Sequence, residues 1–126
     1  MPVSKRPRGP APGSPVRGSK SGRPIMALLD LLGRRPTLRL LWELRGGEPL
    51  TFRALAAAAE TNPGSLNRRL AELREVGVLA AGPEGYALTG EGRALLSALG
   101  PLWEWAVAWA SRVNVRRSSE EPTADP

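Results

Sequence analysis

Thr-Asn-Pro-Gly-Ser-Leu-Asn-Arg-Arg-Leu-Ala-Glu-Leu-Arg-Glu-Val-Gly-Val-Leu, residues 61 to 79, contains a complete helix followed by the start of a strand. Asn62 can cap a helix that begins at Pro63, because the first helical position does not use the N–H group that proline lacks. Gly77 ends this helix. Three leucines spaced four and three residues apart form one apolar stripe along it, namely Leu66, Leu70 and Leu73.

The opposite face of this helix is small and polar, and it carries Gly64, Asn67, Arg68 and Ala71. Arginine and asparagine side chains can each bond the edge of a DNA base through two hydrogen bonds. A capped helix with such a face, followed by a strand, is typical of a helix that enters the major groove of DNA.

The apolar period is helical elsewhere as well. We expect one helix that begins at Ile25 and stops near Gly33, a second over about residues 36–45, and a third over residues 52–59 with Thr51 as its cap.

A short hairpin and one further helix complete the predicted order. Residues 78–81 and 86–88 can pair across the turn at 82–85. Thr89 then caps a long last helix over about residues 91–112, bent or interrupted near Pro101. The predicted fold is therefore mainly α: a winged helix-turn-helix with a short two-stranded β wing and a long C-terminal helix.

The formal net charge of +6 belongs to the N-terminal segment. Residues 1–23 contain six basic residues and no acidic one, so the rest of the chain is neutral. This segment is rich in Pro, Gly and Ser, and we predict that it is a disordered basic tail. We expect a second, polar disordered tail over residues 113–126. Residues 24–112 then form the DNA-binding and dimerisation domain.

Composition narrows the functional classes. The chain has neither Cys nor His, which excludes disulfides, a Ser-His-Asp triad, an imidazole base and the usual zinc sites. We expect no enzyme, no metal and no cofactor. No apolar run follows the basic N-terminus, and residues 94–110 are too short for a membrane span and contain Pro101 and Glu104. The expected location is the cytoplasm.

From residue 23 to about 110 the chain resembles the HxlR-type winged helix-turn-helix transcriptional regulators, which belong to the MarR-like group. This resemblance implies a homodimer that binds a palindromic DNA operator through the fourth helix. It is carried by Pro24-Ile25, Leu29-Asp30-Leu31-Leu32-Gly33, Thr37-Leu38-Arg39-Leu40-Leu41, Glu43-Leu44, Gly47, Phe52-Arg53-Ala54-Leu55, Leu66, Arg69-Leu70, Glu72-Leu73, Gly77-Val78-Leu79, Tyr86, Leu88-Thr89 and Gly92.

The chain departs from that family in three places. Pro36 stands where the family usually has a tryptophan, and Arg23 stands where many relatives carry a redox-sensing cysteine. The hairpin is short and has no Lys or Arg between Glu75 and Gly92. Contact between this wing and the minor groove is therefore in doubt.

The first turns of the second helix in a helix-turn-helix lie nearest the bases. We therefore predict base contacts from Gly64, Ser65, Asn67 and Arg68. Residues at helix starts and on the helix flank are the candidates for phosphate contacts, namely Thr51, Arg53, Thr61 and Arg69. The alternative is that these arginines only solvate the helix and pair with its acids, as Arg68 and Glu72 can at a spacing of four.

Three tryptophans fall within seven residues of the last helix. Aromatic residues are enriched at the centres of protein interfaces, and the resembled family pairs its subunits through the first and last helices. The predicted dimer interface consists of Ile25, Leu28, Leu29, Leu99, Leu102, Trp103, Trp105 and Trp109. The alternative is that the tryptophans cover the core of their own chain.

The sequence thus predicts a sequence-specific DNA-binding transcriptional regulator, a homodimeric repressor of the cytoplasm. Two alternatives stay open. One is a winged-helix module that binds a protein partner and has no specific DNA binding. The other is a sensor with a small-molecule effector in an aromatic pocket between Trp42 and the tryptophans of the last helix.

Overall fold

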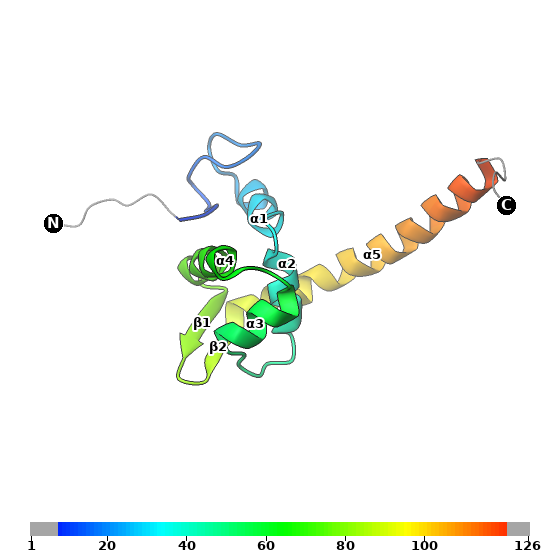
Figure 1. The fold of residues 1–126 in the computed structure, drawn as a ribbon. Coiled ribbons are helices and arrows are strands. Elements are labelled where there is room, and N and C mark those ends of the chain that lie inside the picture. Colours follow the sequence, from blue (N-terminus) through cyan, green and yellow to red (C-terminus); the bar gives the residue numbers. More distant parts are fainter. Residues whose placement is uncertain (1–7, 121–126) are drawn as a thin grey trace. The chain divides into compact units, whose positions relative to one another are not determined.

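The computed structural model describes residues 8–120 and has the expected order of elements (Figure 1). Four short helices precede a two-stranded antiparallel sheet, and a long helix follows it, which confirms a mainly α winged helix. The elements are α1 (Pro24–Leu32), α2 (Thr37–Glu43), α3 (Phe52–Ala59), α4 (Pro63–Glu75), β1 (Leu79–Gly82), β2 (Gly85–Leu88) and α5 (Gly90–Glu120).

The chain divides within α5 into two compact units, Met1–Ala94 and Leu95–Pro126. This division lies inside the range 24–112 that we predicted to be one domain. Helix α5 also continues past residue 112 as far as Glu120, into the segment for which we predicted a disordered tail. The last part of that predicted tail, residues 121–126, lies outside the described residues.

Side-chain caps fix where three of the helices begin. The Thr51 hydroxyl accepts a hydrogen bond from the Ala54 N–H at 3.1 Å, and the Asn62 side-chain oxygen accepts one from the Ser65 N–H at 2.9 Å. The Thr89 hydroxyl does the same for the Gly92 N–H at 3.0 Å. Each cap satisfies a backbone donor that has no partner within its helix, so all three predicted caps are confirmed.

The core of the first unit is made of leucines. Helix α2 packs on α3, α3 packs on α4, and α4 packs on β1. The predicted apolar stripe of α4 faces this core completely, because its three leucines are buried. Burial of a leucine side chain contributes about 1.5–3 kcal/mol to folding. The fully buried leucines of this unit are Leu40, Leu41, Leu44, Leu55, Leu66, Leu70 and Leu73.

The wing is a hairpin reinforced by one residue of the loop before α3. Leu79 pairs with Leu88 at its base, and Gly82 pairs with Gly85 at its tip. Leu50 and Tyr86 exchange both backbone hydrogen bonds, at 2.8 and 2.9 Å. Gly85 has a φ of +125°, and a Cβ at this position would approach the Leu50 carbonyl oxygen to 2.4 Å. Only glycine therefore permits this close pairing.

Helix α5 is not interrupted at Pro101, which lies inside it. We had allowed for a break or a bend at this point. A proline inside a helix removes one backbone donor, and the hydrogen bonds on either side of it can persist.

Residues 8–22 follow a defined path, which the composition of this segment did not predict. Val16 and Ser19 form an isolated antiparallel bridge, and Gly13 donates its N–H to the Gly22 carbonyl at 2.9 Å. Arg17 donates its backbone N–H to the Asp30 carboxylate of α1 at 3.1 Å. These backbone bonds and the bond to Asp30 hold the segment in place. Residues 1–7 of the predicted tail lie outside the described residues.

A buried carboxylate connects α4 with the loop between α1 and α2. Glu72 is 1 % exposed, and its two oxygens bond Arg69 Nη1 at 2.9 Å and Arg34 Nη1 at 3.3 Å. Arg34 also lies 3.6 Å from the Asp30 carboxylate of α1. The Arg68–Glu72 pair that we considered is thus replaced by pairs of Glu72 with Arg69 and Arg34.

We predict that Glu72→Gln lowers the free energy of unfolding by about 3 kcal/mol, since it leaves the buried Arg69 guanidinium without a counter-charge. Glu43→Gln is the matched control, because Glu43 pairs with the exposed Arg39 at 2.8 Å. The control should lose about 1 kcal/mol or less. Urea unfolding measures both variants, and equal losses would contradict the role given to Glu72.

Candidate nucleic-acid interface

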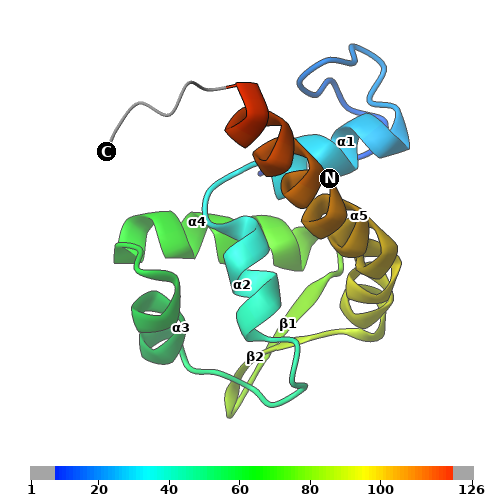
Figure 2. The ribbon, with the colours of Figure 1, turned by 90° about the vertical axis from the view of Figure 1, so that its right-hand side faces the viewer.

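Helices α3 and α4 form a helix-turn-helix whose turn is residues 60–62 (Figure 2). Because the leucine stripe of α4 is buried, the opposite side of this helix faces solvent. Gly64, Asn67 and Arg68 are exposed on that side. Ser65, the fourth residue for which we predicted a base contact, is only half exposed, and its N–H bonds the cap residue Asn62.

The outward side of α4 borders a groove of about 560 Å³. Its charged residues are Arg8, Arg68 and Arg74, and no carboxylate of residues 8–120 lines it. A groove with three cations and no anion attracts a polyanion such as the DNA backbone. Its remaining lining residues are Gly64, Asn67, Leu70, Ala71 and Tyr86.

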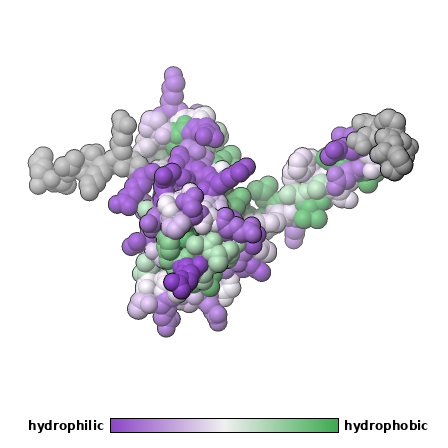
Figure 3. Space-filling model, in the orientation of Figure 1, coloured by the Kyte–Doolittle hydropathy of each residue, from purple (hydrophilic) through white to green (hydrophobic). Residues whose placement is uncertain are grey.

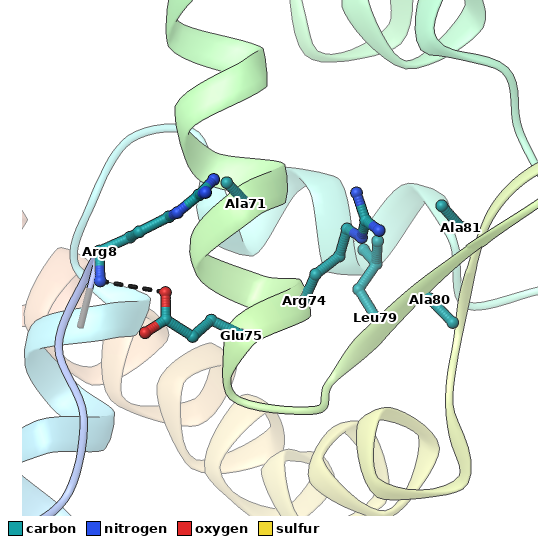
Figure 4. Close-up of a pocket in the computed structure, with 7 residues that line it drawn as sticks. All are labelled: Arg8, Ala71, Arg74, Glu75, Leu79, Ala80 and Ala81. Atoms are coloured by element: carbon teal, nitrogen blue, oxygen red, sulfur yellow. Dashed lines mark hydrogen bonds between the residues drawn. The ribbon is translucent and has the colours of Figure 1, made fainter. Parts of the chain in front are cut away.

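A second groove of about 580 Å³ runs between α4 and β1 (Figure 4). Three of its lining residues, Arg8, Ala71 and Arg74, also line the first groove, so the two adjoin. The second groove includes one acid, Glu75, whose carboxylate accepts the Arg8 N–H. We refer to the exposed surface of Gly64, Asn67, Arg68, Ala71 and Arg74 as the α4 face.

The residues of these grooves that were missing from the predicted set of contacts include Arg8, Arg74 and Tyr86. Arg74 could have been found, because it lies three residues after Ala71 and seven after Asn67, a spacing that places them on one helix face. Tyr86 and Arg8 come from the hairpin and from the N-terminal segment. Only tertiary structure brings them to α4, so no local pattern identifies them.

The four residues proposed for phosphate contacts have different surroundings. Arg53 and Thr51 are exposed at the start of α3, although the Thr51 hydroxyl already serves as a cap. Thr61 is half exposed in the turn. The Arg69 side chain is 11 % exposed and bonds Glu72, which leaves little of its guanidinium for a phosphate. Arg69 therefore pairs with an acidic residue of its own helix, which was the alternative to a phosphate contact.

The wing supplies no positive charge. Its tip consists of Pro83 and the exposed, acidic Glu84, and no Lys or Arg follows until Arg93. The cations that line the two grooves therefore come from α4 and, as Arg8, from the N-terminal segment.

Apolar side chains are exposed in both units. On α1, Ile25 and Leu29 are exposed and Leu28 is half exposed. On α5, the rings of Trp105 and Trp109 stack with centroids 5.5 Å apart, and these side chains are 54 % and 49 % exposed.

Other apolar residues of α5 differ in exposure. Leu102 and Trp103 are exposed, whereas Leu99 is buried. Hydrophobic residues are visible along this helix in Figure 3. The stacking places the rings of Trp105 and Trp109, two members of the predicted dimer interface, side by side.

The described residues contain neither a metal site nor a membrane span. No group of three or more acidic side chains within them is arranged to hold a metal ion. None of the helices in the described part of the chain combines the length and the apolar character that crossing a membrane requires.

No protein-family model and no curated protein matches the sequence. In fold, the chain is similar to YodB from B. subtilis, whose crystal structure was determined with bound quinone. The TM-score is 0.63 at 24% sequence identity, over 68% of this chain and 97% of YodB. The similarity shows that the two chains share the winged-helix fold.

Substitution by alanine should affect stability much more at Arg69 than at the adjacent Arg68 of α4. Arg69→Ala removes a buried hydrogen-bonded ion pair and should lower the free energy of unfolding by about 2 kcal/mol. Arg68→Ala removes an exposed side chain and should change it by about 0.5 kcal/mol or less. Urea unfolding tests this difference, and a larger loss for Arg68→Ala would refute the assignment of the two faces.

Proposed function

We propose that this chain is a sequence-specific DNA-binding transcriptional regulator of the HxlR type, which acts in the cytoplasm as a homodimeric repressor. The observation that carries the proposal is the exposed α4 face. It belongs to the second helix of a helix-turn-helix, and the groove beside it is lined by three cations and, in the part of the chain that the structure describes, by no carboxylate.

In the proposed complex α4 enters the major groove. The Arg68 guanidinium bonds O6 and N7 of a guanine, and the Asn67 amide bonds N6 and N7 of an adenine. Each such pair contributes about 1–3 kcal/mol of discrimination between bases. Gly64 has no side chain, so the DNA can approach the first turn of the helix closely. Thr51, Arg53 and Thr61 lie near helix starts, where phosphates are favoured.

A two-fold dimer would present two copies of α4 to one side of the duplex. Successive major grooves are about 34 Å apart, and a palindromic operator matches this symmetry. Exposed aromatic and aliphatic side chains on α1 and α5 support such an interface, since apolar patches of this kind favour protein contacts. Repression then follows when the dimer occupies the operator and blocks its use.

Footprinting on the DNA upstream of the protein's own gene tests this function. We expect a protected inverted repeat. Arg68→Ala should weaken binding to that site by about 1–3 kcal/mol and relax the preference at one base position. Arg39→Ala, which removes a cation that lines neither groove, should leave that preference unchanged. If the full-length chain binds no duplex in a salt-sensitive way, the interaction-module alternative is favoured instead.

The proposed dimer has a separate test. We expect the protein to sediment as a dimer, and the double substitution Trp105→Ser and Trp109→Ser to shift it toward the monomer by removing the stacked aromatic pair. Val107→Ser is the control, because Val107 is exposed but lies on the other side of α5. Analytical ultracentrifugation measures all three proteins. A dimer that persists in the double variant would rule out this interface.

A further inference from the structure

The first described residues of the N-terminal segment lie directly against α4. Arg8 donates its backbone N–H to the Glu75 carboxylate at 3.1 Å, and Pro10 is buried. Between them, Gly9 lies against the Glu72 side chain. A Cβ on Gly9 would come within 2.6 Å of Glu72 Cγ and 2.8 Å of its Cδ. The contact therefore requires glycine.

The side chain of Glu72 cannot move aside for a larger residue. It is buried, and both of its oxygens are bonded to arginines, Arg69 at 2.9 Å and Arg34 at 3.3 Å. The same N-terminal segment has a second attachment, where the Arg17 N–H bonds Asp30 on α1 at 3.1 Å. Two helices thus hold the segment at two points along its length.

This attachment determines where the Arg8 side chain lies. Figure 4 shows it extending from the N-terminal segment toward Ala71 of α4, and Arg8 lines both grooves together with Arg74. Among the described residues no carboxylate lines the groove that Arg8, Arg68 and Arg74 share, and Glu75 lines only the adjoining groove. Three guanidinium groups around one open groove form a suitable site for phosphate oxygens.

From this geometry we infer that residues 8–10 are a fixed arm on α4, and that Arg8 binds a DNA phosphate beside the base-reading residues. The inference rests on the proposed function and adds a contact to it. In this chain the wing has no cation to contribute, and the arm places one next to α4 instead. Because Arg8 reads no base, it should strengthen binding to all sequences alike.

A double-substitution cycle in the full-length chain tests the arm. Binding of the protected duplex is measured against salt concentration for the wild type, Arg8→Ala, Gly9→Ala and the double variant. Arg8→Ala should reduce the salt slope of the log affinity by about 0.9, the contribution of one phosphate contact. Gly9→Ala leaves every charge in place but displaces the arm, so it should weaken binding equally. The double variant should match either single variant.

Gly46→Ala is the matched control, because a Cβ at Gly46 would have no atom within 4 Å. It should bind as the wild type does. If Arg8→Ala weakens binding while Gly9→Ala does not, Arg8 acts from a free tail and the fixed arm is wrong. Tighter binding by Gly9→Ala would mean that the arm covers the α4 face as an inhibitor, which also overturns the inference. If Arg8→Ala and Gly9→Ala both bind the duplex as the wild type does, Arg8 makes no contact with DNA and the inference is wrong.

Hydrogen exchange on the free protein separates failure of the arm from failure of the proposed function. The Arg8 amide should exchange more slowly in the wild type than in Gly9→Ala, whether or not DNA is bound. Slow exchange without any duplex binding by the wild type would leave the attachment in place and refute DNA binding. Equal exchange rates would refute the attachment itself. Urea unfolding confirms that Gly9→Ala is folded before either measurement.

Discussion

The position of α4 depends on the ion pairs that the buried Glu72 carboxylate forms with Arg69 and Arg34. Removing a carboxylate from water costs several kcal/mol, and two guanidinium groups offset this cost only when their geometry is good. The two partners come from different parts of the chain, Arg69 from α4 itself and Arg34 from the loop after α1. Gly9 of the N-terminal segment packs against the same side chain. One ionised group thereby holds three segments together.

The consequence for α4 is a strict division between its two sides. Successive helical residues differ by about 100° in direction, so Arg68 and Arg69 have different environments although they are neighbours in sequence. Arg69 belongs to the buried network with the leucines, whereas Arg68 belongs to the α4 face with Asn67 and Arg74. The ion pairs of Glu72 and the buried leucine stripe together fix this orientation, so the α4 face points outward.

Local signals predicted most of the fold, and tertiary contacts account for what was missed. Asn62 and Thr51 are caps that act within three residues, so sequence placed the starts of α4 and α3 correctly. The partners of Glu72 could not be predicted in the same way, since Arg34 lies 38 residues away. Composition also favoured disorder for residues 8–22, because nothing in it reveals that Glu75 and Asp30 offer acceptors to that backbone.

The acidic tip of the hairpin limits which features of an operator the proposed complex can recognise. Regulators that insert cations into the narrow minor groove sense A·T-rich flanks through groove width and electrostatic potential. The tip of the hairpin, made of Pro83 and Glu84, has no such group. In the proposed complex the Glu84 carboxylate would repel the phosphates of the DNA. In the proposed complex the wing therefore does not sense flanking sequence, and discrimination between targets falls to the bases that contact α4.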